Sequence, residues 1–122
     1  MHLEELKLGN ITILSPRDPR IDRRRASDLK ETVARLVEHD QRRIIVDLTR
    51  VAFIDSAGIG ALLSGLKQAG PGGELALAAP REAVSTQLRL THLDRIFRSY
   101  PSVRAAVRAL SQARPARGVE EP

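Results

Sequence analysis

The feature that most constrains the fold is the almost continuously apolar run Ile-Ile-Val-Asp-Leu at residues 44–48. Such a run is typical of a strand that is covered on both faces, as in a parallel sheet. The segment before it carries apolar residues at helical spacing and is predicted to be a helix that ends near residues 39–40. These residues are Ala26, Leu29, Val33, Leu36 and Val37. With a strand ahead of the helix, this order implies parallel pairing through a right-handed crossover.

Residues 6–8 and 11–14 are predicted to form two short strands, joined at the turn Gly9-Asn10. A two-residue turn of this composition favours a β-hairpin. Residues 15–20 contain two prolines, which disfavour regular structure, so this segment is predicted to be a loop.

Residues 53–54 lead into a second predicted helix, which the glycine-rich stretch 70–73 ends. Its inner stripe is expected to consist of Ile59, Leu62, Leu63 and Leu66. Residues 75–78 follow as a buried strand. Helices are predicted over residues 83–90 and 102–113, with a short last strand between them supplied by Ile96, Phe97 and Tyr100.

These elements predict an α/β fold in which α-helices pack on a small mixed β-sheet. The 122 residues suffice for one domain, which is expected over residues 1–113. Residues 114–122 mix proline, glycine and charge, and are predicted to be disordered.

Composition argues against several classes of function. The chain has no Cys and its three His are far apart, so we expect no disulfide, no metal site and no cofactor. The chain has few aromatic side chains on which bases could stack, namely two Phe, one Tyr and no Trp, so direct nucleic-acid binding is not expected. The N-terminus lacks signal-peptide character and no apolar stretch approaches 20 residues, which predicts a cytoplasmic protein without membrane insertion.

A basic cluster lies in the first third of the chain. Its members are Arg17, Arg20, Arg23, Arg24 and Arg25, with Arg42 and Arg43 further on. The cluster fits contact with phosphates or with an acidic protein face, in keeping with the net charge of +5. It equally fits a solvated loop and helix start, and the sequence leaves both interpretations open.

The most informative segment is residues 55–60, Asp-Ser-Ala-Gly-Ile-Gly. Ser56 stands just before the second helix, where its plain structural role would be that of an N-cap. Gly58 and Gly60 weaken the helix start and are expected to leave backbone that another protein can approach. A helix N-terminus also favours an anion, so an accessible hydroxyl at this position suits phosphorylation.

No motif for catalysis is present. The glycines of residues 58–65 do not have dinucleotide-binding spacing, and no phosphate-cradling Gly-Lys-Ser or Gly-Lys-Thr occurs. Ile54 stands where a nucleophile elbow requires glycine. We therefore expect that the protein is not an enzyme.

Three segments resemble the STAS domain of anti-sigma factor antagonists. They are Asp47-Leu48, residues 53–60, and the pattern Leu-x-Leu-Thr-x-Leu-Asp-x-Ile-Phe at residues 88–97. With the order of the elements, the resemblance covers roughly residues 3–112 and implies a STAS-like fold. Residues 16–20 depart from the family pattern, because they make a longer and stiffer loop near the expected partner surface.

The resemblance implies partner switching. Unphosphorylated, the chain would bind an anti-sigma factor with a GHKL-type serine kinase domain; phosphorylation of Ser56 would release it, and a PP2C-type phosphatase would reverse the modification. Ala57 leaves Ser56 as the only hydroxyl in the segment. The implied partner-binding residues are Asp55, Ser56, Ala57, Gly58, Ile59, Gly60 and Asp22.

Two other roles are found among STAS-like proteins and stay open from the sequence. One is a structural subunit of a lipid-transport ABC complex, and the other is a component of a stress-sensing scaffold. We expect the chain to be a monomer or a weak homodimer.

Overall fold

The computed structural model describes residues 3–112, in which a five-stranded sheet has the order β1-β2-β4-β6-β7. Its strands are β1 (Leu3–Leu8), β2 (Ile11–Pro16), β4 (Arg43–Asp47), β6 (Glu74–Ala78) and β7 (Ser99–Tyr100). β1 is antiparallel to β2, and every other neighbouring pair is parallel. The predicted α/β class, with a small mixed sheet, is therefore confirmed.

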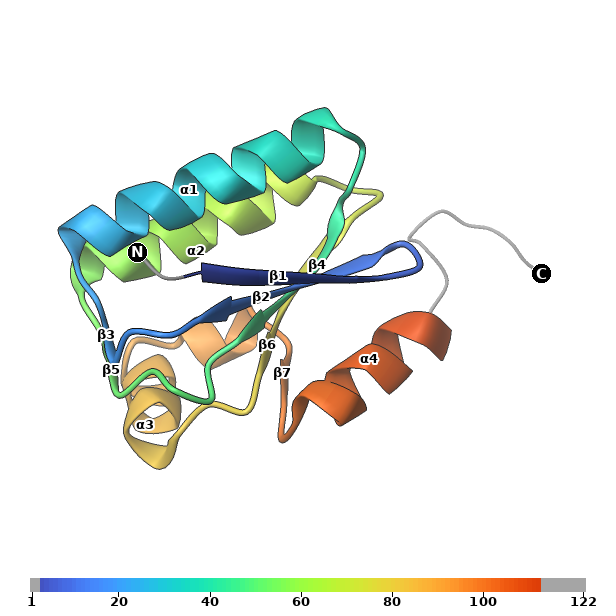
Figure 1. Ribbon diagram of the computed structural model, residues 1–122. Coiled ribbons are helices and arrows are strands. Elements are labelled where there is room, and N and C mark those ends of the chain that lie inside the picture. Colours follow the sequence, from blue (N-terminus) through green and yellow to red (C-terminus); the bar gives the residue numbers. More distant parts are fainter. Residues whose placement is uncertain (1–2, 113–122) are drawn as a thin grey trace.

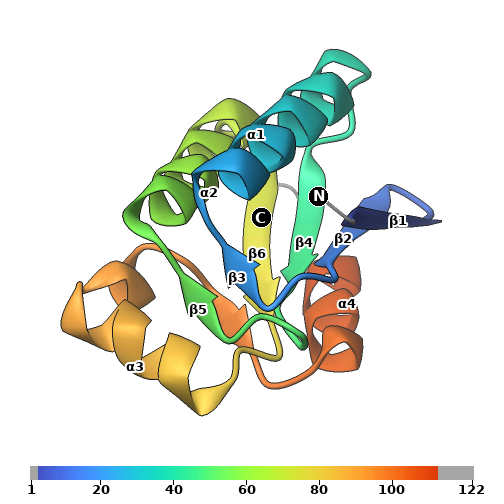
Figure 2. The ribbon, with the colours of Figure 1, turned by 60° about the vertical axis from the view of Figure 1, so that its left-hand side comes forward.

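Helices cover both faces of the sheet (Figures 1 and 2). The helices α1 (Arg23–Glu38) and α2 (Ser56–Ala69) lie side by side on one face, and α4 (Val103–Gln112) lies on the other. Alternation along β4 explains the two layers, because successive side chains of a strand point to opposite faces. Ile44 and Val46 belong to the core under α1 and α2, whereas Ile45 belongs to the core under α4.

A second sheet of two short strands lies at one end of the α1 and α2 pair. β3 (Arg20–Ile21) and β5 (Phe53–Ile54) pair in parallel, and they lead into α1 and α2 respectively. The helix α3 (Glu82–Leu90) lies beside β5, and a 3₁₀ turn at Leu93–Arg95 follows it. This small sheet brings the starts of the two long helices together.

The prediction that residues 15–20 form a loop is wrong at both ends. Ser15 and Pro16 continue β2, and Pro16 pairs with Leu3 of β1. The proline is tolerated because β4 pairs with β2 only as far as Leu14, so Pro16 lies at a strand end where a missing N–H costs little. Arg20 belongs to β3, whose partner β5 could not be recognised from local sequence.

The last strand was also misplaced by the sequence pattern. β7 contains Tyr100 as expected, but its other residue is Ser99. Ile96 is 52% exposed, and Phe97 is buried in the core under α1 and α2. Neither residue belongs to the strand: Phe97 is apolar because it packs in the core, whereas Ile96 lies on the surface.

The inner face of α2 differs from the predicted leucine stripe. Leu62 is buried as expected, and Ile59 and Leu66 are half-buried against the core, but Leu63 is exposed. The buried positions are otherwise small residues, namely Gly58, Ala61, Gly65 and Ala69. Small residues prevail because α2 packs closely on both the sheet and α1, as at Gly65, where an added Cβ would lie 2.8 Å from Leu75 Cδ1.

The expected disordered tail at residues 114–122 lies outside the described residues, as do the first two residues and the last residue of the predicted 1–113 domain. Over residues 3–112, no helix combines the length and the apolar character that crossing a membrane requires.

Candidate functional site

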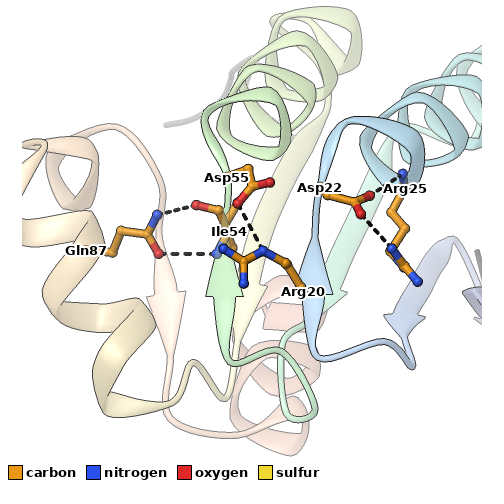
Figure 3. A network of polar contacts seen from close by, with 6 residues as sticks. All are labelled: Arg20, Asp22, Arg25, Ile54, Asp55 and Gln87. Atoms are coloured by element: carbon orange, nitrogen blue, oxygen red, sulfur yellow. Dashed lines mark hydrogen bonds and ion pairs between the residues drawn. The ribbon is translucent and has the colours of Figure 1, made fainter.

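The candidate site lies where β3 enters α1 and β5 enters α2 (Figure 3). In the parallel register, Ile21 pairs with Ile54, and the backbone N–H of Asp55 donates to Ile21 O at 3.0 Å. Asp22 and Asp55, the next residues of the two segments, are the N-cap residues of α1 and α2. Strand pairing therefore brings together two predicted site residues that are far apart in the sequence.

Asp22 is a fully formed helix cap. Its Oδ1 accepts a hydrogen bond from the backbone N–H of Arg25 at 3.1 Å, and its Oδ2 accepts one from Arg25 Nη1 at 2.7 Å. The bond from the Arg25 backbone is the main reason why the pKa of Asp22 is lowered, with the charge of the Arg25 guanidinium adding to it. Asp18 pairs with the same guanidinium at 3.2 Å and raises the pKa of Arg25.

Asp55 has the same position on α2 but a different partner. Its carboxylate makes no cap hydrogen bond, and Oδ1 lies 3.4 Å from Nε of Arg20. The Arg20 guanidinium also lies over the ring of Phe53, 4.7 Å from its centroid. Arg20, the first residue of β3, thus connects this strand to the N-cap of α2 (Figure 3).

Ser56 is the first residue of α2, and it is exposed. The expectation that it caps the helix is wrong, because Asp55 occupies the cap position. Within residues 3–112 its hydroxyl has no hydrogen-bond partner. The hydroxyl is therefore accessible and is not required by the local structure.

The two glycines of the segment have different surroundings. Gly58 is buried, and a Cβ there would lie 2.6 Å from Ile54 Cγ2 and 2.8 Å from Ile21 O. Gly60 is exposed, with nothing within 4 Å of such a Cβ. The expectation that another protein can approach the backbone therefore fits Gly60 but not Gly58. The neighbouring residues Ala57 and Ile59 are half-buried.

A cavity of about 930 Å³ opens beside the site on the α1 side. Its charged lining consists of Asp22, Arg23, Arg24, Arg25, Asp28 and Asp55. Part of the predicted basic cluster therefore borders the site. Arg43 does not, because it is buried on β4 and donates a hydrogen bond to the carbonyl of Leu110 on α4.

Sequence reasoning missed Gln87 as a residue that supports the site. Its side-chain amide accepts a bond from the Ile54 N–H at 3.3 Å and donates one to the Ile54 carbonyl, which holds α3 against the free edge of β5 (Figure 3). No local signal marks Gln87, since its role depends on this contact between distant segments. In the sequence Arg20 is one member of the basic cluster, and its contacts with Phe53 and Asp55 depend on the fold.

The arrangement has no feature of a metal centre. Across the described part of the chain, no three His, Asp or Glu side chains gather closely enough to hold a metal ion. What the site offers chemically is an accessible hydroxyl, flanked by two carboxylates and several arginines.

Comparisons with known proteins agree with the fold. A family model described as the STAS domain matches residues 3–106. A Thermotoga maritima protein named as a candidate anti-sigma factor antagonist is 38% identical over 66 residues, which are 53% of this chain and 58% of the relative. The match thus spans little more than half the length of that relative.

Solved structures extend the likeness over nearly the whole chain. The crystal structure of a candidate anti-sigma factor antagonist from T. maritima has a TM-score of 0.82 and 28% identity, and covers 90% of this chain and 95% of that one. The phosphorylated form of SpoIIAA from Bacillus has a TM-score of 0.70 and 13% identity, with coverages of 89% and 99%, and shares the fold.

Proposed function

Because the chain belongs to the STAS domain family, we propose that it acts as an anti-sigma factor antagonist controlled by phosphorylation of Ser56. In its unphosphorylated form it binds an anti-sigma factor with a GHKL-type serine kinase domain, and phosphorylation releases it. A PP2C-type phosphatase restores the binding form. The names of the Thermotoga relatives support this role, as does a fold neighbour described in both phosphorylated and unphosphorylated forms.

The observation that carries the proposal is the position of Ser56. The residue is exposed at the first position of α2, and its hydroxyl has no partner among residues 3–112. A kinase can therefore reach the hydroxyl without unfolding the helix start. A phosphate at this position also receives favourable interaction from the helix N-terminus, so the modified chain keeps its fold.

The chain takes part in this reaction as a substrate and not as a catalyst. Ser56 Oγ attacks the γ-phosphorus of ATP bound to the kinase, a new O–P bond forms, and the bond to the β-phosphate oxygen breaks to release ADP. The kinase accepts the hydroxyl proton. In the reverse step, water hydrolyses the phosphoester in the phosphatase and returns Ser56 with inorganic phosphate.

Electrostatics explain why the modification weakens binding. Phosphorylation adds about −1.5 to −2 charges at pH 7. These charges arise next to Asp55, on the surface that also carries Asp22. A partner that accommodates the two carboxylates and a small hydroxyl would then face a crowded, strongly negative surface, and burying an unpaired charge there is costly.

Two variants of Ser56 test the proposal with the cognate kinase and ATP. The parent protein should gain one phosphate and Ser56→Ala none, with Ser64→Ala labelled like the parent. Ser56→Asp should bind the kinase at least about tenfold more weakly, because it places a permanent charge in the interface. Ser56→Ala should bind like the parent and unfold within about 0.5 kcal/mol of it.

Two results would contradict the proposal. One is phosphate on Ser64 or Thr49 with Ser56 unmodified. The other is full binding by Ser56→Asp, which would favour the constitutive role of a transporter subunit or of a scaffold component.

A further inference from the structure

We propose that Arg20 is the counter-ion within the chain for phosphorylated Ser56. Its guanidinium moves away from Asp55 and pairs with the phosphate. This inference rests on the proposed function and assigns a role to part of the basic segment that the proposed function does not use. Arg20 would act as a positioning residue, because it holds the modified side chain and takes no part in phosphoryl transfer.

The backbone of Arg20 is fixed at the correct place. Arg20 pairs with Phe53 in the parallel register of β3 and β5. The preceding residue, Pro19, accepts hydrogen bonds at its carbonyl from the N–H groups of Ala52 and Phe53, at 2.6 and 3.2 Å. The proline-containing segment that departs from the family pattern is therefore tied to the strand that leads into Ser56.

The side chain of Arg20 already points to the start of α2. Its guanidinium lies on the Phe53 ring, and Nε is 3.4 Å from Oδ1 of Asp55, the neighbour of Ser56 (Figure 3). The Arg20 side chain is 59% exposed, so rotation about its bonds meets little obstruction. A phosphate on Ser56 would be one residue further along the chain than Asp55, the present partner of Arg20. We expect that the long arginine side chain can reach it.

A phosphate is a better partner for Arg20 than the carboxylate that it now contacts. The contact with Asp55 is long and exposed, and ion pairs of this kind are weak. A phosphoserine carries up to two charges and three acceptor oxygens, and the planar guanidinium fork matches phosphate in a bidentate way. The guanidinium should therefore exchange partners when Ser56 is modified.

The other arginines near the site are less suited to this role. Arg25 is held by Asp18 and Asp22, at 3.2 and 2.7 Å. Arg23 and Arg24 lie in the first turn of α1 and line the cavity that borders the site, but among the described residues the ion pair of Asp55 is with Arg20 and not with either of them. Within the described part of the chain, Arg20 is the arginine that forms an ion pair with the residue next to Ser56.

The test measures the second pKa of the phosphate in the full chain, with phosphoserine installed at position 56 during translation, so that no kinase is needed. Free phosphoserine has this pKa near 6. A nearby cation favours the dianion and lowers the value. In ³¹P NMR titrations, Arg20→Gln should raise the phosphate pKa by about half a unit, and Arg20→Lys should raise it by less.

Control variants show which arginine pairs with the phosphate on Ser56. Arg104→Gln, exposed on α4, should leave the phosphate pKa unchanged, and Arg24→Gln, at the cavity that borders the site, should raise it by clearly less than Arg20→Gln does. Thermal unfolding of the unmodified Arg20→Gln protein should match that of the parent within about 3 °C, since the residue makes only weak exposed contacts.

An unchanged phosphate pKa in Arg20→Gln would overturn the inference, as would a rise in Arg24→Gln of the size expected for Arg20→Gln. Either result leaves the kinase and binding experiments on Ser56 untouched. Conversely, a kinase that does not modify Ser56 would refute the proposed function whatever the titrations show.

Discussion

Gly58 and Gly60 occupy the same helical turn, but the absence of a side chain has different consequences at the two positions. The helix α2 approaches β3 and β5 so closely at Gly58 that a methyl group would meet a backbone oxygen, which cannot move aside. Gly60 faces open space. At the first position glycine is required by packing, and at the second it only weakens the helix.

This difference predicts opposite effects of the same substitution. Gly58→Ala should reduce the free energy of unfolding by about 1–3 kcal/mol, because the site is overpacked. Gly60→Ala should increase it by up to about 1 kcal/mol, since alanine is the better helix former. Urea unfolding of both variants measures the effects. A stable Gly58→Ala protein would mean that α2 can move away from Ile21 without loss.

At the scale of elements, the starts of α1 and α2 are built alike and used differently. Each follows a short strand and has an aspartate at its N-cap. In α1 the carboxylate closes the cap by bonding to Arg25 N. In α2 the Asp55 carboxylate makes no cap hydrogen bond to the first N–H groups of the helix and faces Arg20 instead. The open cap is the one beside the accessible hydroxyl of Ser56.

The two caps should respond differently to substitution and to pH. Asp22→Ala should lower the thermal midpoint more than Asp55→Ala, because only Asp22 bonds to a backbone N–H. The folded-state pKa of Asp22 lies below the ordinary value of 3.8, so its charge stabilises the fold fully above that value. This stabilisation is lost as the pH falls through the folded-state pKa.

The variant Asp22→Asn separates the charge from the cap, because asparagine can still accept the Arg25 N–H bond. It should be less stable than the parent at neutral pH but lose less stability on acidification below about pH 3.8. Thermal unfolding as a function of pH measures this, together with NMR titration of the Asp22 carboxyl group. Parallel pH profiles for parent and variant would show that Asp22 does not contribute to the acid response.

At the scale of the whole molecule, the sheet separates two cores. The larger one lies under α1 and α2, whose N-termini carry the candidate site, and the smaller one lies under α4. Leu62 belongs to the first and Leu110 to the second, and both are nearly fully buried. The site should therefore be sensitive to packing on one face of the sheet and insensitive to packing on the other.

Truncation of these two leucines tests the separation. Leu62→Ala and Leu110→Ala should each reduce the free energy of unfolding by about 2–5 kcal/mol, as large-to-small changes in a core do. Under conditions where both variants are folded, only Leu62→Ala should shift the backbone amide NMR signals of Asp22, Asp55 and Ser56. Shifts of equal size in Leu110→Ala would show that the sheet transmits packing changes to the site.

Local sequence predicted most of the elements and the position of Ser56 at the beginning of a helix. Apolar spacing predicted α1, α3 and α4 to within a few residues, and the apolar run predicted β4, because helical and extended periodicities are properties of neighbouring residues. The Asp-Ser-Ala-Gly segment marked Ser56 at the start of α2, and the structure places it there.

Only the tertiary structure decided how these elements make a surface. The β3 and β5 pairing, the cap position of Asp55, the inward face of Gly58, and the contacts of Arg20 and Gln87 all join segments that are distant along the chain. Strands of two residues carry no periodicity, and a side chain's partner is set by whichever segment the sheet brings beside it. Asp22 and Asp55 border the same cavity because the parallel strands before them align their ends, which is a property of the sheet and of neither segment by itself.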